Sequence, residues 1–102
     1  MATSTSALPL SEEAFHPGEF IADELRARGM TQRELARRMG RPYQAVNEII
    51  RGRKAVTAET ALALARVFEQ RAETWMALQA RYELTVARAR EAGVAEDRPA
   101  AS

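Results

Sequence analysis

The sequence contains no cysteine, so it forms neither disulfides nor a thiolate metal site, and its stability must come from packing. Its longest stretch without a charge, Met1 to Ser11, is polar and too short to span a bilayer. The first 25 residues contain no Lys or Arg, so they do not have the pattern of a secretory signal. These absences predict a cytoplasmic protein with no membrane association. The 102 residues suffice for one domain with a modest core.

Residues suited to catalysis are also scarce. His16 is the one histidine, and the serines all lie in the terminal segments, at Ser4, Ser6, Ser11 and Ser102. No group of histidines and carboxylates has the spacing of a metal site. The sequence therefore predicts no enzyme, no cofactor and no metal. It favours His16 as a helix cap or a solvated residue rather than a catalyst.

Charged residues are unevenly distributed, although the net charge is only +1. Residues 1–25 hold five acidic residues and no basic ones, which gives −5. Residues 26–54 hold nine basic residues against two acidic ones, which gives +7, and residues 55–102 carry −1. A concentrated basic segment in a near-neutral protein favours a local anionic partner, unless folding mixes the segments and averages the field.

Glycine and proline divide the chain into segments with helical periodicity, and no segment alternates like a β-strand. Gly29, Gly40, Gly52 and Gly93 each follow such a segment, where a left-handed residue typically ends a helix. The sequence therefore predicts an all-α fold with five helices, at about 17–28, 32–39, 43–51, 58–69 and 73–92. They would form one domain over residues 16–92, between flexible tails at 1–15 and 93–102.

Hydroxyl residues mark two of the helix starts, and apolar spacing indicates the inner faces. Thr31 and Glu34 have the spacing of a capping box, and Thr57 is placed to cap the fourth helix. The residues expected to face inward are Ile21 and Leu25 in the first helix and Leu62, Ala65 and Phe68 in the fourth.

The second and third predicted helices have the residue pattern of a helix-turn-helix. Counting from Gln32, the small residue Ala36 stands at the fifth position, where the second helix of the unit crosses closely. Gly40, at the ninth position, can adopt the positive φ of the turn. Val46 and Ile49, at the fifteenth and eighteenth positions, lie on one face and would lock the helices together. This agreement favours a helix-turn-helix over an ordinary helical hairpin.

Such a unit places its second helix in the major groove of DNA and its first helix across the backbone. The residues expected to contact bases are those not needed for packing, namely Tyr43, Gln44, Asn47 and Glu48. Amide side chains form paired hydrogen bonds with adenine, and glutamate accepts from cytosine. The residues expected to contact phosphates are Gln32, Arg33, Arg41, Arg51, Arg53 and Lys54. The alternative for each of them is a solvated surface side chain.

The last predicted helix carries two apolar stripes where a single-domain bundle needs only one. The first contains Trp75, Leu78, Tyr82, Val86 and Ala89, and the second contains Met76, Ala80, Leu84 and Ala87. Either the helix has one broad core-facing surface, or its part beyond Tyr82 meets a second copy of the chain. We favour a homodimer through Tyr82, Val86 and Ala89, because two half-sites multiply the affinity for DNA.

Several motifs resemble the HigA family of antitoxins. They are His16-Pro17-Gly18-Glu19, Met30-Thr31-Gln32 with Leu35-Ala36, Val46-Asn47-Glu48-Ile49-Ile50-Arg51-Gly52, Thr57-Ala58-Glu59-Thr60-Ala61-Leu62, and Trp75-Met76-Ala77-Leu78-Gln79-Ala80-Arg81-Tyr82-Glu83-Leu84. Together they cover most of residues 16–90, and they are more specific than a general helix-turn-helix. The resemblance implies a five-helix Xre/Cro-like (lambda repressor-like) domain with an extended C-terminal helix.

The resemblance also implies an antitoxin of a type II toxin–antitoxin system. Such antitoxins neutralise a HigB toxin, a RelE-like ribonuclease that cleaves messenger RNA. They also bind operator DNA as dimers and repress their own operon. A ribonuclease that binds RNA is usually basic, so the acidic first 25 residues would complement it. The expected toxin contacts are Glu19, Asp23 and Glu24, unless these acids only stabilise the N-terminus of their helix.

Two further interpretations remain open. The chain could be a stand-alone Xre-type repressor without a toxin partner, which a basic reading frame beside its gene would argue against. It could instead bind a toxin and have lost DNA binding, although Gln44 and Asn47 look suited to base contacts.

Overall fold

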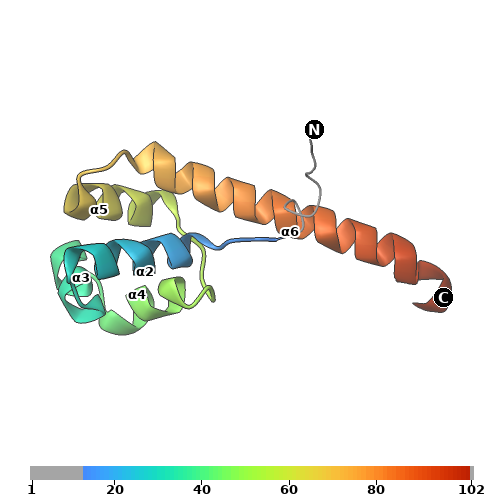
Figure 1. Cartoon of the computed structure of the whole chain (residues 1–102), viewed down its shortest axis with the longest axis horizontal. Helices are drawn as coiled ribbons and strands as arrows, with labels where there is room; N and C mark the ends of the chain where they lie inside the picture. Colours follow the sequence, from blue (N-terminus) through green and yellow to red (C-terminus); the bar gives the residue numbers. More distant parts are fainter. Residues whose placement is uncertain (1–12, 102) are drawn as a thin grey trace. The chain divides into compact units, whose positions relative to one another are not determined.

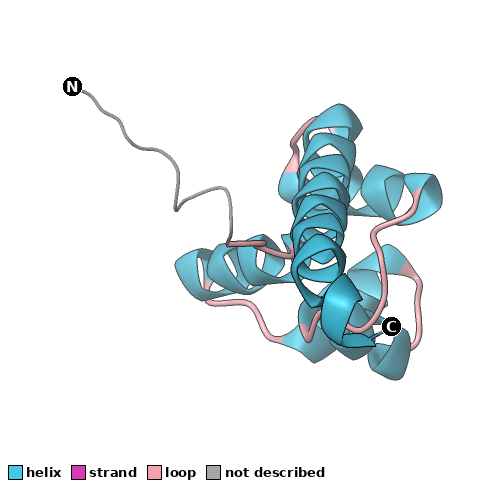
Figure 2. Cartoon of the chain, turned by 90° about the vertical axis from the view of Figure 1, so that its right-hand side faces the viewer, coloured by secondary structure: helices cyan, strands magenta, loops and turns pink. Residues whose placement is uncertain are grey.

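The computed structural model describes the backbone of residues 13–101 and the side chains of residues 13–93. Every regular element in this part of the chain is a helix (Figure 2). The helices are α2 (Pro17–Arg28), α3 (Gln32–Met39), α4 (Tyr43–Ile50), α5 (Ala58–Phe68) and α6 (Ala72–Ala101). The predicted all-α fold with five helices is confirmed. Most of the expected N-terminal tail lies outside the described residues.

The chain divides into two units. One unit, His16–Gln79, contains α2 to α5 and the start of α6, and the other contains α6 from Ala80 onward. Within the first unit α4 packs against both α2 and α3, and α3 also packs against α5 (Figure 1). The helix-turn-helix formed by α3 and α4 is therefore supported by the helices on either side of it in the sequence.

The first unit encloses one hydrophobic core. Its fully buried members include Ile21 of α2, Leu35 of α3, Val46 of α4 and Leu64 of α5. The remaining core residues are Leu25, Ala36, Met39, Ile49, Val56, Ala61, Ala63, Phe68 and Trp75. The predicted inner residues of the first helix and of the helix-turn-helix are thus confirmed.

Helix ends follow the predicted capping residues. The Thr31 side chain accepts a hydrogen bond from the backbone N–H of Glu34 at 3.0 Å, and Thr57 caps α5 in the same way. Gly29 and Gly40 end α2 and α3 in the left-handed conformation, with φ of 64° and 71°. Local sequence signals therefore define the boundaries of α2 and α3.

The prediction that Leu62 faces inward is wrong, because its side chain is 55% exposed. Helix α5 instead buries Ala61, Leu64 and Phe68, whose spacing is also typical of one helical face. Both sets contain Phe68, so periodicity alone does not separate them. The small Ala61 is fully buried and allows a closer approach of neighbouring helices than a leucine would.

The prediction that the last helix ends near Ala92 is also wrong, because α6 continues through Gly93 to Ala101. Gly93 does not adopt a positive φ, unlike Gly29, Gly40 and Gly52. A glycine inside a helix costs only about 1 kcal/mol relative to alanine, and the surrounding alanines and arginines favour helix. Glycine therefore ends a helix only where the chain also has to turn.

Candidate nucleic-acid interface

The packing of α3 against α4 leaves one face of α4 uncovered by the core. Val46 and Ile49 are 2% and 6% exposed and face inward. Of the four residues predicted to contact bases, Tyr43 and Gln44 are exposed, and Asn47 and Glu48 are half-buried. The structure therefore places all four on the part of α4 that does not form the core.

A side-chain amide pair connects the two helices on this surface. The Nδ2 group of Asn47 donates a hydrogen bond to Oε1 of Gln32 at 2.8 Å, at a partly buried position. Gln32 is the first residue of α3. The pair uses one of the two Nδ2 hydrogens of Asn47, and a paired contact with a base would need the other one together with Oδ1.

A second pair connects the same two helices beside it. The guanidinium carbon of Arg33 lies 4.4 Å from the centre of the Tyr43 ring. This is the geometry of a cation–π contact, in which the planar guanidinium rests on the ring face. The Tyr43 ring is thus held at the start of α4, with Arg33 as a cation beside it.

Glu48 has a cationic partner as well. Its carboxylate lies 3.5 Å from Nζ of Lys54, in the turn that follows α4. An isolated carboxylate on a DNA-binding face would repel phosphates, and this pairing reduces that repulsion.

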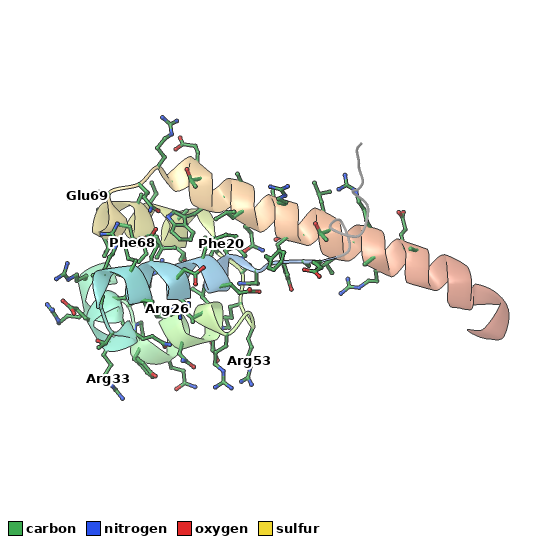
Figure 3. The ribbon with its side chains drawn as sticks, in the orientation of Figure 1. Phe20, Arg26, Arg33, Arg53, Phe68 and Glu69 are labelled. Carbon is green, nitrogen blue, oxygen red and sulfur yellow. The ribbon has the colours of Figure 1, made fainter. Side chains whose placement is uncertain are left out.

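Cations lie around both ends of α4. Arg51, Arg53 and Lys54 are exposed at its C-terminal end. Figure 3 shows Arg33 and Arg53 projecting on the same side of the molecule, on either side of α4. Arg41 is half-buried, and its Nη1 donates to Oγ1 of Thr60 at 3.4 Å. Arg41 therefore connects the helix-turn-helix to α5 in addition to the phosphate contact predicted for it.

His16 is a buried helix cap, which is one of the two roles predicted for it. Its Nδ1 accepts a hydrogen bond from the backbone N–H of Gly18 at 2.8 Å, and the residue is 7% exposed. Burial lowers the pKa of His16 below its ordinary value, and smaller effects of Lys54 and Glu19 oppose that shift. A neutral ring is required here, because only an unprotonated Nδ1 can accept a hydrogen bond.

The acidic residues predicted to contact a toxin differ in their surroundings. Glu19 and Asp23 are exposed on α2, and Asp23 forms an exposed ion pair with Arg26. Glu24 accepts hydrogen bonds from Arg28 at 2.9 Å and from Gln70 at 3.0 Å. The hydrogen bond from Arg28 is the main cause that lowers the pKa of Glu24. Glu24 thus connects α2 to the turn that follows α5, a contact that its spacing in the sequence does not indicate.

The residues predicted at a dimer interface lie on α6, beyond Ala80. Tyr82 and Val86 are half-buried and Ala89 is exposed. Leu84 of the second stripe is 52% exposed. This part of α6 therefore keeps apolar side chains at its surface.

The described residues contain no group of three or more histidine, cysteine, aspartate or glutamate side chains that could hold a metal ion. Among those same residues, no helix combines the length and apolar character needed to cross a membrane.

Comparison with known proteins places this geometry in a family. Residues 21–75 match the helix-turn-helix family. Virulence-associated protein I of Dichelobacter nodosus is 37% identical over 75 residues, which cover 72% of this chain and 69% of that protein. An addiction module antidote protein of the HigA family from Coxiella burnetii has a similar structure. It is 34% identical with a TM-score of 0.76, over 83% of this chain and 94% of that one.

The antitoxin HigA of Pseudomonas aeruginosa, solved with the higBA promoter, is also 34% identical. Its TM-score is 0.76, over 82% of this chain and 92% of that one. The fold and the uncovered face of α4 define a helix-turn-helix protein, and the chain belongs to that family. Within it, the chain is a member of the HigA family of antitoxins. The family predicted from the sequence motifs is thereby confirmed.

Proposed function

We propose that this protein binds operator DNA as a dimer, represses its own operon, and neutralises a HigB-like, RelE-type toxin that cleaves messenger RNA. The observation that carries the DNA-binding part is the surface of α4. There Gln44 is exposed, Asn47 is held by Gln32, and Tyr43 is held by Arg33. Amide side chains read bases, and the flanking cations neutralise phosphates. The Pseudomonas relative solved with its promoter supports the same assignment.

The proposed dimer would form through α6 beyond Ala80, with Tyr82, Val86 and Ala89 in the interface. A two-fold dimer presents two copies of α4 to two half-sites, which strengthens binding without any new contact in either copy. Light scattering on the wild type and on Val86→Glu tests this arrangement. We expect a dimer for the wild type and a monomer for the variant, and a dimer in both cases would exclude this interface.

The proposed toxin surface is the exposed acidic part of α2. Glu19 and Asp23 are exposed, although Asp23 forms a solvent-exposed ion pair with Arg26, whereas Glu24 is half-buried and accepts hydrogen bonds from Arg28 and Gln70. Reversing the charge of Glu19 and Asp23 with lysine should weaken toxin binding. Glu73→Lys, an exposed acid at the start of α6, is the matched control. Equal affinity of the double variant and the control would remove this surface from consideration.

A growth-rescue assay tests the antitoxin function as a whole. The reading frame beside this gene is expressed alone and then together with this protein. Growth arrest when the neighbouring reading frame is expressed alone, and normal growth when both are expressed, would establish that this protein neutralises a toxin. Arrest without rescue, or no arrest, would favour a stand-alone repressor, and binding to the upstream DNA would then be measured by itself.

A further inference from the structure

The N-terminus of α2 lies directly against the C-terminal end of α4. A Cβ atom placed on Gly18 would lie 2.2 Å from the carbonyl oxygen of Ile49 and 2.6 Å from that of Ile50. These are backbone atoms of α4, which cannot move aside as a flexible side chain can. The two helices therefore touch through their backbones, at a position where only glycine fits.

The turn after α4 is closed from the α4 side by a Schellman motif. Gly52 has a φ of 80°, and its N–H donates to the carbonyl of Ile49 at 3.0 Å. The N–H of Arg53 donates to the carbonyl of Glu48 at 2.8 Å. This pattern satisfies the last carbonyls of the helix and fixes the start of the turn.

His16 holds the same turn from the α2 side. Its ring packs on Gly52, where an added Cβ would lie 3.7 Å from Cγ of the histidine. The backbone of Lys54, two residues further along this turn, raises the pKa of His16 and so partly offsets the effect of burial. Because Nδ1 already accepts from Gly18, the ring's N–H is at Nε2, which can donate to a carbonyl. One buried side chain thus caps α2 and fixes the turn at the end of α4.

We infer that His16 is a positioning residue for DNA phosphate contacts, acting by fixing the turn that carries Arg51, Arg53 and Lys54. The inference rests on the proposed DNA-binding function. His16 is buried and does not itself reach DNA, but its ring packs on Gly52, two residues before Lys54 in the same turn. A long cationic side chain that starts from a fixed backbone loses less entropy when it binds a phosphate than one that starts from a mobile turn.

The test uses His16→Asn in the full-length chain. Asparagine is an effective N-cap, so the hydrogen bond from Gly18 has a substitute. Its side chain is too short to cover Gly52 and reach Lys54 together. We measure dissociation constants for a duplex of the upstream operator region and for a random duplex, at a series of salt concentrations. Fluorescence of Trp75 monitors folding.

We expect His16→Asn to weaken binding to both duplexes by the same factor. The salt slope should become shallower by about one for each phosphate that the protein no longer neutralises. The His16→Asn substitution should have a smaller effect on the Lys54→Ala protein than on the wild type, because both act on the same phosphate-binding turn. His16→Ser, which also caps a helix, provides a second variant if the asparagine variant does not fold.

Wild-type affinity and salt slope in a folded His16 variant would overturn the inference, as would an equal effect of the substitution with and without Lys54. A wild-type protein that binds the operator region no better than random DNA would instead contradict the proposed function. The two failures are therefore distinguishable.

Discussion

Replacing Gly18 by alanine tests how closely α2 approaches α4. The added methyl carbon would lie 2.2 Å from the carbonyl oxygen of Ile49, so the helices must separate by about 1.2 Å to restore an ordinary contact of 3.4 Å. Overpacking of this kind typically costs about 1–3 kcal/mol. The intrinsic preference of a helix for alanine over glycine offsets at most about 1 kcal/mol. We expect a net loss of about 1–2 kcal/mol in the free energy of unfolding, or about 4–16 °C in Tm.

Thermal unfolding followed by the fluorescence of Trp75 measures this change, because Trp75 is the single tryptophan and is 2% exposed. Gly93→Ala is the matched control. Gly93 lies inside α6, and an added Cβ would meet nothing within 4 Å. The control substitution should not lower the Tm that Trp75 fluorescence reports, and it should increase the helix content measured by circular dichroism. A Gly18→Ala protein as stable as the wild type would refute the close backbone contact.

Three other predictions concern the DNA-binding surface and its support. Asn47→Ala should lower the discrimination between bases at one operator position by about 1–3 kcal/mol of binding free energy. Competition between operator variants measures this base preference. Unchanged base preference would mean that Asn47 does not read a base. Arg53→Ala should weaken binding to all DNA alike and reduce the salt slope by about one, whereas Arg26→Ala, at an exposed position on α2, should not. Equal slopes in the two variants would contradict the phosphate contact. The lowered pKa of His16 means that the unfolded chain takes up a proton before the folded one as the pH falls. The contribution of His16 to the free energy of unfolding should therefore be fully present above the ordinary histidine pKa of about 6.5 and should decrease as the pH falls below it. In His16→Asn this decrease in stability at low pH should be smaller. Equal pH dependence of Tm in both proteins would contradict this assignment.

Local signals in the sequence predict the helix boundaries of the first unit well. Thr31, Gly29 and Gly40 act through hydrogen bonds and backbone angles within a few residues, so the sequence contains the whole interaction. Gly93 shows the limit of such signals, because its surroundings favour a continuous helix. Leu62 shows another, since α5 has two faces of similar apolar content and tertiary packing selects one of them.

The candidate site is predictable as a set of residues but not as a set of contacts. The helix-turn-helix spacing places Asn47 and Tyr43 on the uncovered part of α4, as the structure shows. Their pairing with Gln32 and Arg33 depends on the angle between α3 and α4, which no local pattern encodes. The packing of His16 on Gly52, in the turn after α4, also joins residues far apart in the sequence.

The side-chain pairs between α3 and α4 have a consequence for the entropy of association. Immobilising a flexible side chain at an interface costs about 0.5–1.5 kcal/mol. Asn47 is already restrained by Gln32, and Tyr43 by Arg33, before any partner arrives. The conformational freedom of these side chains is therefore given up during folding rather than during binding. A DNA duplex that preserves both pairs would meet a nearly rigid surface, and its association would show a smaller entropic penalty than that of a variant in which the pairs are removed.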